Sequence, residues 1–145
     1  MLIAYEDNRV PSEVFHFVER KLSDYTSMKK LVETYEKEAE DVRTKSRQWS
    51  DDPPPTLGQE SPVERKAIRV LILEESAQKA YHWVKGIEDV MANLSEEERR
   101  LVKLRYYNTS YTNNAVAWEL NMSRATYYRK REEIIRKFAI RFGLL

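Results

Sequence analysis

Apolar residues recur every seven positions along the middle of the chain, and a second apolar position falls within the same heptads. The first position is filled by Val63, Val70, Ala77, Val84 and Met91, and the second by Leu73, Ala80, Ile87 and Leu94. This spacing brings side chains to one face of a helix. The pattern therefore predicts a long helix with a continuous apolar face from residue 63 to residue 94.

A similar apolar stripe runs through about residue 48, made by Met28, Val32, Tyr35, Ala39 and Val42. The polar residues 23–27 interrupt the pattern before it, and their serine, threonine and aspartate side chains compete for backbone hydrogen bonds. We therefore expect a short helix at about 12–22, followed by a longer one.

The two long stripes are separated by residues 50–61, where three consecutive prolines at 53–55 exclude a helix. After this proline-rich loop, Ser61 is an N-cap, Pro62 takes the first helical position and Glu64 completes a capping box. A helix therefore begins at Pro62. Two amphipathic helices joined by a loop pack antiparallel, because otherwise their apolar faces meet water.

The composition agrees with an all-α fold. Charged residues make up 34% of the chain and there are three glycines, a balance that favours solvated helices. We predict an antiparallel helical hairpin over residues 1–94 and a DNA-binding domain over residues 95–145. The hairpin is either a plain scaffold or a surface for oligomerisation or a partner. Because two helices alone bury little surface, we expect a homo-oligomer.

The last fifty residues begin with a second capping box, in which Ser95 is followed by glutamates at 96–98. The helix that starts here should direct Leu101, Val102 and Leu104 inward. Asparagine, threonine and serine at 108–110 then break the pattern, so the helix should end near residue 107.

A helix-turn-helix follows. Apolar residues at 116, 117 and 120 share one helical face, and the small Ala117 allows a second helix to approach closely. In the turn, Asn121 tolerates the left-handed conformation, Met122 points back to the core, and Ser123 caps the next helix.

On that second helix Tyr127 belongs inside, so its neighbours face the major groove. Arg124 and Arg129 can donate paired bonds to guanine or clamp phosphates, while Lys130 and Arg131 widen the cationic edge. The predicted DNA-contacting residues are Thr112, Asn113, Ser123, Arg124, Ala125, Thr126, Tyr128, Arg129, Lys130 and Glu132.

The charge distribution also favours a polyanionic partner. Residues 96–145 carry eleven Lys and Arg against six Glu, a net +5, whereas residues 1–95 carry a net −4. Clustered cations bind double-stranded DNA by releasing counterions from its phosphates.

Residues 94–107, together with the helix-turn-helix, resemble region 4 of sigma-70-type factors. Residues 123–129 resemble the recognition helix of phage late-gene transcriptional activators of the RinA and ArpU type, and residues 61–69 resemble a further segment of that family. The resemblance implies a protein that binds late-gene promoters and recruits host RNA polymerase. The chain departs from the common pattern at Asn121, usually glycine, and at Lys130, usually apolar, which leaves Ile134 and Ile135 to supply the packing.

Several other classes are disfavoured. The chain has no cysteine, as suits a reducing cytosol, has no apolar run long enough to span a bilayer, and starts with acidic residues where a signal peptide is basic. We expect a cytoplasmic protein, in the host cell if the resemblance holds. His16 and His82 are isolated and no reactive set converges, so we predict no enzyme activity, catalytic residue, metal or cofactor.

Two alternatives to a transcriptional regulator stay open. A small terminase subunit, the DNA-packaging adaptor of phages, also joins a helix-turn-helix to a helical hairpin, but usually places the DNA-binding part first. The second alternative is a helical interaction protein whose basic segment binds an acidic partner.

Overall fold

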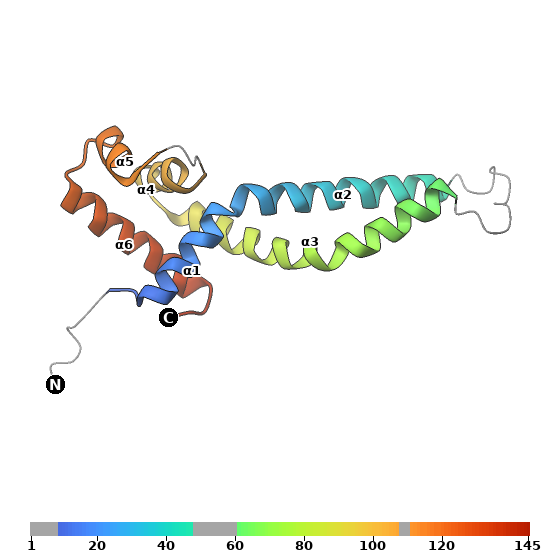
Figure 1. Cartoon of the computed structure of the whole chain (residues 1–145), viewed down its shortest axis with the longest axis horizontal. Coiled ribbons are helices and arrows are strands. Elements are labelled where there is room, and N and C mark those ends of the chain that lie inside the picture. The colour runs from blue at the N-terminus through green and yellow to red at the C-terminus, as the bar shows by residue number, and fades with distance from the viewer. Residues whose placement is uncertain (1–8, 48–60, 108–110) are drawn as a thin grey trace. The chain divides into compact units, whose positions relative to one another are not determined.

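The computed structural model describes residues 9–47, 61–107 and 111–145 (Figure 1). Within these ranges every regular element is helical, which confirms the all-α prediction. The elements in chain order are α1 (Ser12–Ser23), α2 (Tyr25–Arg47), α3 (Pro62–Asn93), α4 (Glu96–Val102), the π-helical segment η3 (Lys103–Tyr107), α5 (Asn113–Glu119) and α6 (Arg124–Arg141).

The chain divides into two compact units. Met1–Thr26 and Trp83–Leu145 form one, which we call the terminal unit, and Ser27–His82 forms the other, the central unit. This division differs from the predicted one at residue 94, because α1 packs against α6 and so joins the C-terminal helices. No helix among the described residues is long and apolar enough to cross a membrane.

In the central unit, ion pairs link α2 to α3. Lys66 donates to Asp41, and Arg69 Nη2 lies 3.2 Å from Glu38 Oε1. As the residue number rises along α3, the partner's number falls along α2. The hydrogen bond from Lys66 lowers the pKa of the Asp41 carboxyl below its ordinary value. Of the predicted loop 50–61, all but Ser61 lies outside the described residues.

The start of α3 is the predicted one. Ser61 Oγ accepts from the Glu64 N–H at 3.1 Å, and Glu64 Oε2 accepts from the Ser61 N–H at 3.2 Å. These reciprocal bonds satisfy donors that the first helical turn leaves unpaired. The predicted heptad stripe of α3 is buried at Ala77, Ala80, Val84, Ile87, Met91 and Leu94, and half-buried at Val63, Val70 and Leu73.

The break between α1 and α2 is shorter than the polar cluster 23–27 predicts. Only Asp24 separates the helices, and its N–H still donates to Arg20 O at 2.9 Å. Tyr25 begins α2 because its ring has tertiary partners: its hydroxyl donates to Glu88 Oε2 at 2.5 Å, and it stacks on Tyr107 with ring centroids 4.7 Å apart. These contacts outweigh the local preference of serine and aspartate for turns.

The core of the terminal unit lies between α1, α4, η3 and α6. It is apolar and includes Phe15, Val18, Leu22, Leu101, Val102, Tyr106, Ile134, Ile135, Phe138 and Ala139, all buried. Gly86 of α3 lies at the edge of this core, where an added Cβ would be only 3.3 Å from the Phe142 ring. A side chain here would therefore require the Phe142 ring to shift by a few tenths of an ångström, so Gly86 serves close packing rather than a turn.

Candidate nucleic-acid interface

The segment α5–turn–α6 is defined by caps at both helix starts. Thr112 Oγ1 accepts from the Ala115 N–H at 3.2 Å, and Ser123 Oγ accepts from the Thr126 N–H at 3.1 Å. Between the helices Asn121 has φ 55°, the left-handed conformation that its sequence position predicts. Both the cap at Ser123 and the conformation of Asn121 are thus confirmed.

A backbone hydrogen bond closes the turn onto α5. The Met122 N–H donates to Ala117 O at 2.9 Å, and Ala117 is buried with 4% of its surface exposed. Its burial leaves little room for a larger side chain at residue 117. Met122 is half-buried.

Four predicted contact residues are exposed on one side of α6: Arg124, Ala125, Tyr128 and Arg129. We call them the outer face of α6. They occupy the first two turns of the helix, so the two guanidinium groups lie near a helix N-terminus, which favours anions. The face combines cationic donors, a phenol that is 38% exposed and a small alanine. Such a set can contact both phosphates and base edges.

The remaining predicted residues of α6 and its cap also interact within the fold. The Ser123 hydroxyl donates to Thr126 Oγ1 at 2.9 Å, and Lys130 Nζ lies 3.7 Å from Glu97 Oε1. Glu132 is half-buried rather than outward-facing, and its Oε1 accepts from the Val10 N–H at 2.6 Å. Glu132 therefore attaches the segment before α1 to α6.

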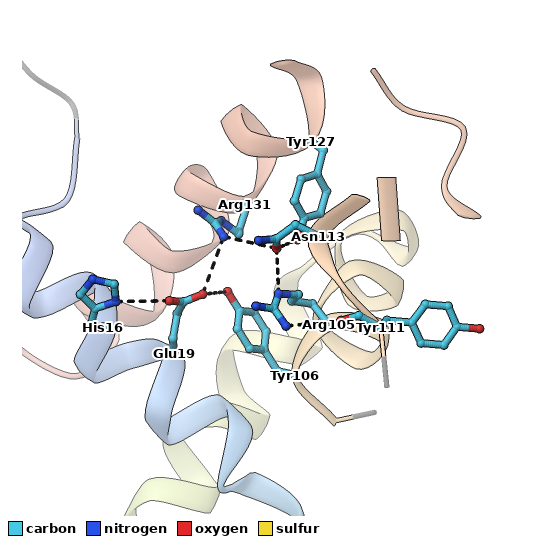
Figure 2. Close-up of polar contacts among 8 residues, drawn as sticks. All are labelled: His16, Glu19, Arg105, Tyr106, Tyr111, Asn113, Tyr127 and Arg131. Carbon is cyan, nitrogen blue, oxygen red and sulfur yellow. Dashed lines mark hydrogen bonds and ion pairs between the residues drawn. The ribbon is translucent and has the colours of Figure 1, made fainter. Parts of the chain in front are cut away.

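Asn113 is half-buried at the centre of a polar network (Figure 2). Its Oδ1 accepts from Tyr127 Oη at 2.6 Å, from Arg105 Nε at 2.7 Å and from Arg131 Nη1 at 3.3 Å. Burial raises the pKa of the Tyr127 hydroxyl, which keeps it protonated as a donor. One amide oxygen thus joins η3, α5 and α6.

Glu19 of α1 extends this network. Its Oε2 accepts from Tyr106 Oη at 2.7 Å and lies 3.9 Å from Arg131 Nη1, while its Oε1 lies 3.5 Å from His16 Nδ1 (Figure 2). Burial, together with the Glu19 carboxylate, raises the pKa of Tyr106 far above its ordinary value. The phenol is therefore a permanent donor to Glu19.

The prediction that Arg131 widens the cationic edge is wrong. Its side chain is only 18% exposed, and its guanidinium lies 4.8 Å from the centroid of the Phe15 ring and 5.0 Å from that of Tyr128. The sequence carried a signal for this position, because Arg131 is four residues after the inward-facing Tyr127 and so lies on the same side of α6. Ile134 and Ile135 are fully buried, as the packing role expected of them requires.

Trp118 of α5 is a surface residue that the sequence analysis missed. It is 78% exposed, although tryptophan is a large apolar side chain. The spacing that directs residues 116, 117 and 120 inward turns residue 118 to the opposite side of the helix, so its exposure could have been predicted. The indole adds an aromatic group to the surface of the helix that precedes the outer face of α6.

The described ranges also bear on metal binding. No group of three His, Cys, Asp or Glu side chains comes together there in a way that could hold a metal ion. A shallow groove of about 280 Å³ lies beside His16, Glu19 and Tyr106. The Glu19 carboxylate in this groove accepts from Tyr106 and pairs with Arg131, so it has a structural role.

Comparison with known proteins returned one family. Neither the curated proteins nor the solved structures include a match to the chain. A family model described as "Protein of unknown function (DUF722)" matches residues 18–140, a range that includes every helix from α2 to α5 and nearly all of α6. The chain therefore belongs to the DUF722 family.

Proposed function

We propose that this protein binds double-stranded DNA with sequence preference through the outer face of α6, and that it regulates transcription rather than catalysing a reaction. In this proposal α5, the turn at residues 120–123 and α6 act as a helix-turn-helix, with α6 entering the major groove. The observation that carries the proposal is the exposure of Arg124 and Arg129 on the first two turns of a helix capped by Ser123.

The chemistry of the outer face fits the major groove. An arginine guanidinium donates two parallel hydrogen bonds to O6 and N7 of guanine, or to two oxygens of one phosphate. The Tyr128 hydroxyl is a further donor for a phosphate oxygen, and Ala125 leaves room for a base edge or a thymine methyl group. The network around Asn113 supports the proposal because it holds α5 against α6, and a recognition helix needs such a fixed orientation.

The regulatory part of the proposal rests on the resemblance of residues 94–107 and 123–129 to sigma-70 region 4 and to RinA-type and ArpU-type activators. It implies binding at late-gene promoters of a phage and contact with host RNA polymerase. The ion pairs of Lys66 and Arg69 with α2 support an antiparallel helical hairpin that presents a partner surface. The net +5 of residues 96–145 supports attraction to DNA.

The experiment that tests DNA binding starts with selection of bound sequences from random duplexes. Fluorescence anisotropy on the selected duplex then compares the wild-type chain with Arg129→Ala and with Arg43→Ala as the matched control. Arg43 is an exposed arginine of α2, 66% accessible and in the central unit, so the control removes the same charge away from the outer face.

We expect Arg129→Ala to weaken specific binding by about 1–3 kcal/mol and to relax the base preference at one position, while Arg43→Ala has little effect. Circular dichroism verifies that both variants keep their helicity. Equal affinities of the two variants would exclude the outer face as the recognition surface. Weak affinity that is the same for every duplex would favour an acidic protein partner instead, and a closed ring of many subunits in light scattering would favour a packaging adaptor.

A further inference from the structure

Helix α3 has apolar residues outside the stripe that it buries. Ile68, Leu71 and Ile72 are 47%, 67% and 71% exposed, and all three belong to the central unit. Their spacing of three and four residues brings them together on one side of the helix, away from the buried Ala77 and Ala80. Three large aliphatic side chains gathered in water are a feature of interaction surfaces.

Charged residues extend this patch in both directions. Arg65, Ile68, Ile72 and Glu75 follow one another at intervals of three, four and three residues, the alternation of a coiled-coil seam. We call these four residues the outer seam of α3. Arg65 and Glu75 are both exposed, and they carry opposite charges at equal distances from the middle of the seam.

We propose that the outer seam of α3 binds the outer seam of a second copy of this chain in an antiparallel dimer. In that alignment Ile68 packs on Ile72 of the partner subunit, and Arg65 faces Glu75 of the partner subunit. The two-fold axis makes each of these contacts twice. Leu71 flanks the seam near the axis, where it meets Leu71 of the partner subunit.

Charge selects this orientation over the parallel one. A parallel pair would bring Arg65 against its own copy and Glu75 against its own copy, so both ends of the seam would repel. Glu75 Oε1 also lies 3.4 Å from Lys79 Nζ in the same helix, but both side chains are more than 70% exposed. An ion pair so exposed to water is weak and leaves the carboxylate accessible to a partner.

The first test is a charge exchange, measured by sedimentation equilibrium on the full chain. We expect the wild-type chain to dimerise, and Arg65→Glu or Glu75→Arg alone to raise the dissociation constant by about tenfold or more, since each creates two like-charge contacts. The double variant Arg65→Glu/Glu75→Arg should restore dimerisation. Arg43→Glu, a change of the same size on α2, should leave it unchanged. A monomeric wild-type chain, or a double variant as weak as the single ones, would overturn the proposal.

The second test reads the orientation by disulfide trapping. The chain has no cysteine, so a single introduced thiol reports only on its own copy. Under mild oxidation Leu71→Cys should cross-link, because the two copies of residue 71 lie beside the two-fold axis. Lys79→Cys should not, because an antiparallel seam separates its two copies by about 27 Å along the helix. The reverse result would indicate a parallel pair. Because both tests use residues of the central unit, they are independent of DNA binding by α6.

Discussion

The network centred on Asn113 allows the effect of a substitution on the free energy of unfolding to be predicted. Replacing Asn113 by alanine removes the acceptor of three donors: the Tyr127 hydroxyl, Arg105 Nε and Arg131 Nη1. Tyr127 is fully buried, so its hydroxyl cannot turn to water, and a buried donor without a partner costs about 1–3 kcal/mol. The two guanidinium groups keep other partners and partial access to solvent, which reduces their share.

We therefore expect Asn113→Ala to lower the free energy of unfolding by about 2 kcal/mol. Asn114→Ala is the matched control, because Asn114 is the next residue of α5, is exposed, and gains the same helix propensity on substitution. Asn113→Asp retains the acceptor oxygen and adds a negative charge beside Arg105 and Arg131, so it should be at least as stable as the wild-type chain at neutral pH.

Urea-induced unfolding followed by circular dichroism gives the free energies of unfolding of the wild-type chain and the three variants under one set of conditions. The interpretation of the network is refuted if Asn113→Ala and Asn114→Ala unfold at the same urea concentration. It is equally contradicted if Asn113→Asp is as unstable as the alanine variant, because the accepting oxygen would then contribute nothing.

Three further predictions concern the helix starts and the turn. Because Asn121 has a positive φ, Asn121→Ala should lower the free energy of unfolding by about 1 kcal/mol, while Asn121→Gly should be neutral or stabilising. Equal melting temperatures for the two variants in thermal unfolding would contradict this. Ser123→Ala should cost about 1 kcal/mol by loss of the cap on α6, and Ser123→Asp should retain most of that stability. Burial raises the pKa of Glu98, but hydrogen bonds from the Ser95 N–H and Lys137 outweigh it and lower that pKa below its ordinary 4.5. Its ionised form therefore stabilises the fold fully above about pH 4.5 and progressively less as the pH falls through the lowered value, so Glu98→Gln should flatten that part of the stability profile measured in urea.

The helix starts and the turn could be predicted from the sequence because local interactions determine them. A capping hydroxyl reaches an amide only three residues away, as at Ser61, Ser95 and Ser123. The left-handed conformation of Asn121 likewise depends on that residue's own side chain. The heptad stripe of α3 is predictable for the same reason, since it needs only the helical repeat.

What each polar side chain contacts was decided by tertiary structure. Glu132 accepts from Val10, 122 positions away, and Tyr106 donates to Glu19, 87 positions away. No periodicity in the sequence connects such residues, because their meeting depends on α1 packing against α6 and η3. Asn113 of α5 likewise meets Arg105 of η3 and both Tyr127 and Arg131 of α6, which lie 8, 14 and 18 positions away.

By itself the sequence determined an all-helical chain, where most helices begin, and which face of α6 carries exposed Arg124 and Arg129. Only the tertiary structure decided that α1 joins the C-terminal helices in one unit, that Arg131 is enclosed between Phe15 and Tyr128, and that η3 departs from α-helical geometry. The physical reason is range: backbone hydrogen bonds and caps act within a few residues, whereas burial assigns each side chain its environment through elements distant in the chain.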